Sequence, residues 1–132
     1  MFCTIGKKIT RQKVLLAALL LPWSMAHAVV LECPISAPAE WKVAKSRLDR
    51  ARVLGPSSEG LPEKEWQLNG TLYQAWNMKP AGRNRSSYRV DCMYTGTGRF
   101  IRFDARSVER CVGKRRVRAD TLMPGSMEFR CR

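Results

Sequence analysis

The chain has 132 residues, with 24 Lys and Arg against 11 Asp and Glu, a net charge of +13 and a single histidine. This length suits one domain, and the excess of positive charge favours anionic partners. The histidine, His27, lies in a predicted leader, so the rest of the chain has no group for histidine general-base catalysis, His-activated nucleophiles or imidazole-bound zinc. We therefore expect no enzyme, cofactor or metal site. A hydrolase that uses carboxylates is the least favoured alternative.

Residues 1–28 have the three parts of a secretory signal peptide. A basic stretch precedes an apolar run over residues 14–23, and Ala26-His27-Ala28 is a small-residue cleavage site. The apolar run is about half the roughly 20 residues that a spanning helix needs. Cleavage leaves one domain over residues 29–132 and lowers the net charge to +9, because four basic residues and no acidic one are removed. We expect a periplasmic or secreted protein without a membrane span after cleavage.

Four cysteines remain beyond the leader. An even number of cysteines in an oxidising compartment predicts two disulfides. No two of them are close enough for the C-x-x-C knuckle of a zinc site. The four are Cys33, Cys92, Cys111 and Cys131.

The first half of the predicted domain begins with a β-branched strand over residues 29–35. Residues 39–54 have two interpretations. The spacing of the apolar residues predicts a short helix that ends at Gly55-Pro56, and the alternative is a strand over residues 48–54. Residues 55–65 are rich in Pro, Gly and Ser and predict a loop.

Strand signals dominate the rest. Residues 66–78 predict a hairpin that turns at Asn69-Gly70, and residues 79–87 a basic loop. Over residues 88–94, alternation predicts a strand with Cys92 facing inward and Asp91 facing outward, where it would make a weak surface pair with neighbouring arginines. Five further elements are predicted after this strand: a turn over 95–98, strands over 99–103 and 111–118, a turn over 120–125 and a last strand over 127–131.

These elements predict a mainly β protein, a small antiparallel sheet or sandwich joined by two disulfides. The last turn lies about midway between Cys111 and Cys131, which favours a bond between them. Cys33 would then pair with Cys92. Four cysteines allow three pairings, and the other two stay open.

Basic residues gather in two clusters beyond the leader. Arginine forks carboxylates and phosphates in bidentate fashion, so the clusters predict an acidic protein or an anionic envelope polymer as the partner, and a solvated basic face is the alternative. No nucleic-acid-binding module is recognisable. The tryptophans Trp41, Trp66 and Trp76 are expected in the core, and Glu63 and Glu65 on a charged loop. The candidate partner-binding residues are Arg83, Arg85 and Arg89 in one cluster and Lys114, Arg115, Arg116 and Arg118 in the other.

Several fixed positions carry a resemblance to a known family. They are Cys33-Pro34, Trp41, the stretch from Leu48 to Gly55-Pro56, Tyr88-x-x-x-Cys92-x-Tyr94, Cys111 and Cys131-Arg132. In these features the chain resembles a family of small four-cysteine periplasmic proteins of proteobacteria, some encoded beside type VI secretion clusters. The resemblance implies a sheet-rich fold with a strand over residues 48–54, and no established active site. Such a gene neighbourhood suggests an immunity protein that blocks a cell-wall-directed toxin, with binding of lipopolysaccharide or peptidoglycan as the alternative.

Overall fold

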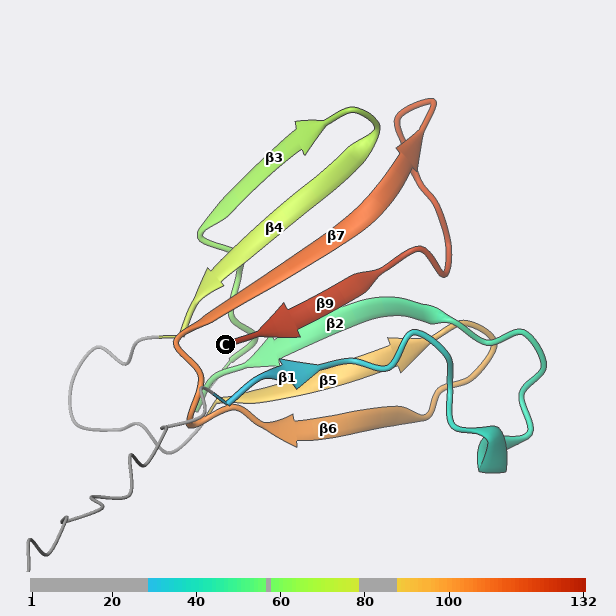
Figure 1. The fold of residues 1–132 in the computed structure, drawn as a ribbon, viewed down its shortest axis with the longest axis horizontal. Helices are drawn as coiled ribbons and strands as arrows, with labels where there is room; N and C mark the ends of the chain where they lie inside the picture. Colours follow the sequence, from blue (N-terminus) through green and yellow to red (C-terminus); the bar gives the residue numbers. More distant parts are fainter. Residues whose placement is uncertain (1–28, 57, 79–87) are drawn as a thin grey trace, which may run out of the picture.

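The computed structural model describes residues 29–56, 58–78 and 88–132, and it shows two antiparallel sheets (Figure 1). Buried side chains of both sheets form one core. The first sheet has the order β1-β9-β7-β4-β3, with β8 also paired to β7, and the second has the order β2-β5-β6. The predicted mainly β fold with two disulfides is confirmed. The predictions for residues 1–28 and 79–87 lie outside the described residues. The strands are β1 (Leu31–Glu32), β2 (Leu48–Leu54), β3 (Lys64–Leu68), β4 (Thr71–Asn77), β5 (Arg89–Tyr94), β6 (Phe100–Asp104), β7 (Arg110–Arg118), β8 (Thr121–Leu122) and β9 (Glu128–Cys131).

Of the two interpretations of residues 39–54, the helix is wrong and the strand over residues 48–54 is confirmed. Only a single 3-10 turn, η1 (Ala39–Trp41), forms there, and the strand β2 follows. The reason is a β-bulge: Leu48 pairs with Tyr94 and Arg50 pairs with Met93, so Asp49 is an extra residue in β2. The bulge places Leu48 and Ala51 on the same buried face although they are three positions apart, and this spacing imitates a helix.

The hairpin prediction for the next segment is confirmed. All of β3 pairs with residues 71–75 of β4, and the two strands meet at Asn69 and Gly70, whose φ angles are 49° and 73°. Two successive positive φ angles form the type I′ turn that matches the twist of paired strands. This turn lies at the end of the first sheet that extends beyond the second sheet (Figure 1).

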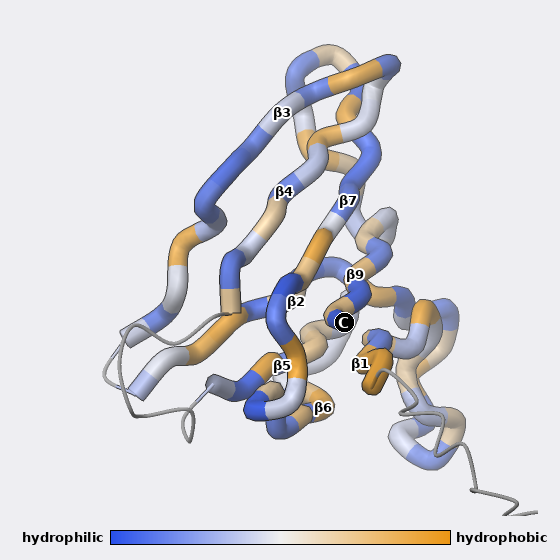
Figure 2. Tube along the Cα trace, turned by 60° about the vertical axis from the view of Figure 1, so that its left-hand side comes forward, coloured by the Kyte–Doolittle hydropathy of each residue, from blue (hydrophilic) through white to orange (hydrophobic). Residues whose placement is uncertain are grey.

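The core lies between the two sheets. The first sheet contributes Trp76 and Phe129, whose rings meet edge to face at 5.5 Å, and the second contributes Leu48, Val53 and Val90. In Figure 2 apolar segments occur along β5, β6 and β7, whereas β3 is mostly hydrophilic. The first sheet is therefore wider than the core that it covers.

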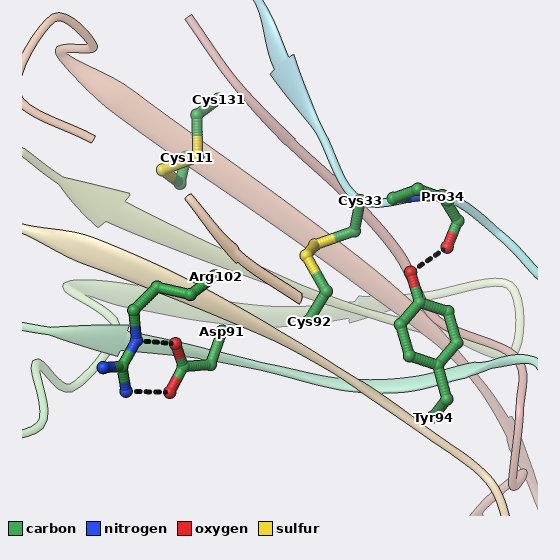
Figure 3. Close-up of a disulfide and its surroundings, with 8 residues drawn as sticks. All are labelled: Cys33, Pro34, Asp91, Cys92, Tyr94, Arg102, Cys111 and Cys131. Atoms are coloured by element: carbon green, nitrogen blue, oxygen red, sulfur yellow. Dashed lines mark hydrogen bonds and ion pairs between the residues drawn. A yellow bond between two sulfur atoms is a disulfide. The ribbon is translucent and has the colours of Figure 1, made fainter. Parts of the chain in front are cut away.

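The two disulfides have different positions in this architecture. Cys33 bonds to Cys92 of β5 and so joins the two sheets, whereas Cys111 and Cys131 face each other on the adjacent strands β7 and β9 (Figure 3). Arg110 and Arg132, next along these strands, exchange two backbone hydrogen bonds of 2.9 and 2.8 Å. The Cys111–Cys131 pair is therefore a non-hydrogen-bonded pair, in which opposite Cα atoms lie closest, here 4.0 Å apart. The pairing favoured from the sequence is confirmed.

Removal of each disulfide should reveal how unequally they stabilise the fold. The Cys33–Cys92 bond spans 59 positions and the Cys111–Cys131 bond spans 20. Loss of the Cys33–Cys92 bond should therefore increase the chain entropy of the unfolded state more. We expect the paired substitutions Cys33→Ala/Cys92→Ala to lower the free energy of unfolding by about 4 kcal/mol, and Cys111→Ala/Cys131→Ala by about 3 kcal/mol. All four cysteines are buried, so the two double variants are matched for cavity formation. Urea unfolding of both would contradict the account if the second variant were the less stable one.

Candidate functional site

Strand β7 distributes its basic residues over both faces of the first sheet. Lys114, Arg116 and Arg118 alternate with Arg115, so the first three lie on the outer face and Arg115 lies on the face toward the second sheet. Lys114 pairs in register with Tyr73 of β4 on one side and with Glu128 of β9 on the other. One predicted cluster is therefore divided between two environments.

A loop between β8 and β9 covers the edge of β7 beside these residues. Met123 donates its backbone N–H to the carbonyl of Arg116 (2.9 Å), and the N–H of Arg116 donates to Ser126 Oγ (3.1 Å). Gly125 has a φ of +66°, which a side chain would strain, and a Cβ there would lie 3.3 Å from Cβ of Arg47. The loop over residues 123–127 is thus held against both β7 and the start of β2.

Asp49, the bulged residue of β2, connects this loop to both sheets. Its Oδ1 accepts the backbone N–H of Gly125 at 2.9 Å and lies 3.5 Å from Nη2 of Arg115. A bulge re-aims the side chain that it adds. Asp49, which breaks the alternating pattern of β2, therefore also anchors the loop.

These elements enclose a groove of about 530 Å³. Its walls carry four basic side chains and one acidic side chain, together with Tyr73 and the loop. We call it the basic groove, and its lining residues are Ile35, Arg47, Thr71, Tyr73, Lys114, Arg115, Arg116, Met123, Pro124, Gly125, Ser126, Met127 and Glu128.

The cations of the basic groove differ in how far they are neutralised. Lys114 Nζ lies 2.8 Å from Glu128, and this hydrogen bond raises the pKa of Lys114. Arg115 has Asp49, although its buried Nε has no hydrogen-bond partner among the described residues. Within the same part of the chain, the side chains of Arg47 and Arg116 make no ion pair or hydrogen bond, and both residues are exposed. The groove therefore offers two free guanidinium groups, which suit carboxylate or phosphate groups.

Three of the predicted partner-binding residues, Lys114, Arg115 and Arg116, line the basic groove. Arg118 lies further along the outer face of β7, and Arg89 lies on β5 of the second sheet. Arg83 and Arg85 lie outside the described residues. Arg47 was missed, because no neighbouring sequence feature marks it and only the approach of Gly125 brings it to the groove.

As expected, Asp91 lies on the outer side of the second sheet and pairs with arginines. The expectation of a weak surface pair is wrong, because the Asp91 side chain is 0% exposed. Arg52 of β2 and Arg102 of β6 pair with Asp91 in register on the solvent side of the second sheet and cover it. Arg102 donates to both carboxylate oxygens at 2.7 and 3.0 Å (Figure 3), and Arg52 donates to Oδ2 at 3.0 Å. The hydrogen bonds from Arg102 hold the pKa of Asp91 below its ordinary value.

Two of the other candidate carboxylates have partners of their own. Glu65 accepts from Gln74 at 2.7 Å, and Asp104 pairs with Arg106. In residues 29–56, 58–78 and 88–132, no group of three or more His, Cys, Asp or Glu is placed to hold a metal ion.

The tryptophans do not share one environment. Trp76 is buried in the core as expected, and Trp41 packs partly against the core. The prediction for Trp66 is wrong, because the residue is 40% exposed on edge strand β3.

Comparisons with family models, with curated proteins and with solved structures find no match to this chain. Among the residues that the structure describes, no helix is long and apolar enough to cross a membrane.

The Asp91 cluster generates a prediction for acid stability. Because its pKa is lowered in the folded state, Asp91 stabilises the fold above its ordinary pKa of 3.8, and this contribution is lost as the pH falls through the lowered pKa. Asp91→Asn should lower the free energy of unfolding by about 2 kcal/mol at neutral pH and flatten its decline in acid. Urea unfolding at a series of pH values measures both. The control is Asp104→Asn, at an ion pair that is more than half exposed, and an equal loss in both variants would contradict the assignment.

Proposed function

We propose that this protein is a periplasmic or secreted binding protein that holds an acidic partner protein at the basic groove, as an inhibitor or immunity protein does. The observation that carries the proposal is the pair of free guanidinium groups, Arg47 and Arg116, in a groove whose other cations are neutralised. The two disulfides indicate an oxidising compartment outside the cytoplasm. The proposal assigns no catalytic step to the protein.

The proposed mechanism is steric occlusion on a rigid surface. The loop over residues 123–127 is fixed by Asp49 and by β7, so the groove is formed before the partner arrives. A preformed site loses less conformational entropy when it binds. The net positive charge also speeds the encounter with an acidic protein, and salt weakens this effect.

Substitution of the two free arginines tests the proposal. The oxidised protein and its Arg47→Gln/Arg116→Gln variant would each be used to capture proteins from extracytoplasmic extract of the native host and of neighbouring strains, with mass spectrometry as the readout. We expect the unsubstituted protein to retain one dominant acidic protein at low salt, and the double variant to lose at least about tenfold in its affinity, because each arginine makes charge-assisted hydrogen bonds.

Arg89→Gln is the matched control, because Arg89 is an exposed arginine on the second sheet. Recovery of the same protein by the double variant, or binding that salt does not change, would remove the basic groove from the mechanism.

An envelope polyanion is the second candidate partner. It is favoured by Arg50 and Arg89, which are exposed on the outer face of the second sheet beside the two arginines that hold Asp91, because a long polymer can follow cations on both faces of the molecule. For such a polymer, we expect Arg89→Gln to weaken binding to purified lipopolysaccharide or peptidoglycan as much as Arg116→Gln does. Sedimentation with washed envelopes measures this binding. If the unsubstituted protein did not bind, the polymer would be rejected as a partner.

A further inference from the structure

Apolar side chains lie beside the basic groove on the outer face of the first sheet. The strand register places Trp66, Tyr73 and Lys114 in one row across β3, β4 and β7, and Leu68, Thr71 and Arg116 in the next row. The rings of Trp66 and Tyr73 stack at 5.3 Å with planes 6° apart. Tyr73 also lines the groove, so the aromatic pair and the groove form one continuous surface.

This aromatic pair does not belong to the core. The second sheet covers only the inner face of the first, and all five residues of β3 are exposed. Trp66 is 40% exposed and Leu68 is 57% exposed, on the same side of the strand. Large apolar side chains that gather on an exposed sheet face indicate an interaction site. Trp, Tyr and Arg are also the residue types that dominate binding energy at protein interfaces.

We propose that the outer face of the β3–β4 hairpin, centred on Trp66, Leu68 and Tyr73, is the apolar centre of the partner interface. This inference rests on the proposed function, because the basic groove then supplies the charged border of the same interface. The partner is a protein that packs apolar side chains on Trp66 and Leu68 and presents carboxylates to Arg116 and Arg47. Desolvation of the border by the apolar contact strengthens these charge pairs.

The neighbours of the aromatic pair favour a protein over a sugar polymer. Recognition of sugar hydroxyls needs polar groups that accept as well as donate hydrogen bonds beside the ring. In these two rows the acceptors beside the rings are the hydroxyls of Thr71 and Tyr73, whereas the other neighbours are Leu68 and cations, and the carboxylate of Glu128 is held by Lys114. Gln74 and Glu65 lie on the other face and bond to each other.

The test compares two acidic polypeptide probes of equal length, poly-glutamate and a random copolymer of glutamate and tyrosine. Binding of each labelled probe to the oxidised protein is measured by fluorescence anisotropy. We expect the copolymer to bind more tightly, and Trp66→Ala to lower its affinity about tenfold while changing poly-glutamate affinity by less than about twofold. Trp66→Phe should restore most of the preference, and Leu68→Ala should reduce it independently. Thermal unfolding shows whether each variant is folded.

Phe100→Ala is the matched control, because Phe100 is a 42% exposed aromatic residue on the second sheet. It should keep the full preference for the copolymer. A preference that is absent in the unsubstituted protein, or unchanged in Trp66→Ala, would overturn the inference. Polygalacturonate, an acidic polysaccharide, is the third probe. If Trp66→Ala lowered the affinity for polygalacturonate as much as the affinity for the copolymer, the aromatic pair would be a sugar-binding surface instead. Failure of the proposed function itself is distinguishable, since poly-glutamate binding would then survive Arg47→Gln/Arg116→Gln.

Discussion

The bond between Cys33 and Cys92 joins the two sheets, and the surrounding structure depends on it. Cys33 follows β1, donates its N–H to Phe129 of β9 at 3.1 Å, and reaches the central strand of the second sheet. Close by, the hydroxyl of Tyr94 donates to the carbonyl of Pro34 at 2.8 Å (Figure 3), and burial raises the pKa of Tyr94 to about 12. A domain of this size buries a limited core, so such covalent and polar links between layers contribute a large share of its stability.

The bulge at Asp49 connects this architecture to the proposed site. A regular strand would place no side chain where Oδ1 of Asp49 meets the N–H of Gly125. Because the loop is held there, Arg47 lies against it and faces the same groove as Arg116. The acidic groups that are present are already used by other partners, Asp49 by Arg115 and Glu128 by Lys114. Arg47 and Arg116 therefore keep an unpaired positive charge, because the two carboxylates near the groove already pair with other cations.

Much of the fold follows from local sequence signals, whereas the details of the site do not. Alternation over residues 88–94 and Asn69-Gly70 predict their strands and turn correctly, because both signals involve neighbouring residues. The bulge in β2 breaks the period of two, so the local pattern left residues 39–54 open between a helix and a strand. Asp91 is buried by arginines from two other strands, which no local pattern can reveal. The position of Arg47 in the groove depends on the loop over residues 123–127, which is distant in the sequence. The exposure of Trp66 depends on the place of β3 at the edge of the sheet, which the strand order determines.

The central claim is that binding takes place on the outer face of the first sheet, at the basic groove and the hairpin beside it. The most direct measurement is a titration of the isotope-labelled, oxidised protein with the glutamate–tyrosine copolymer, followed by backbone amide chemical shifts in NMR spectra. The account predicts that the largest shift changes occur at Tyr73, Arg116 and Ser126 and extend to Trp66. Changes concentrated instead at Arg52, Arg89 and Arg102 would place binding on the second sheet and contradict it.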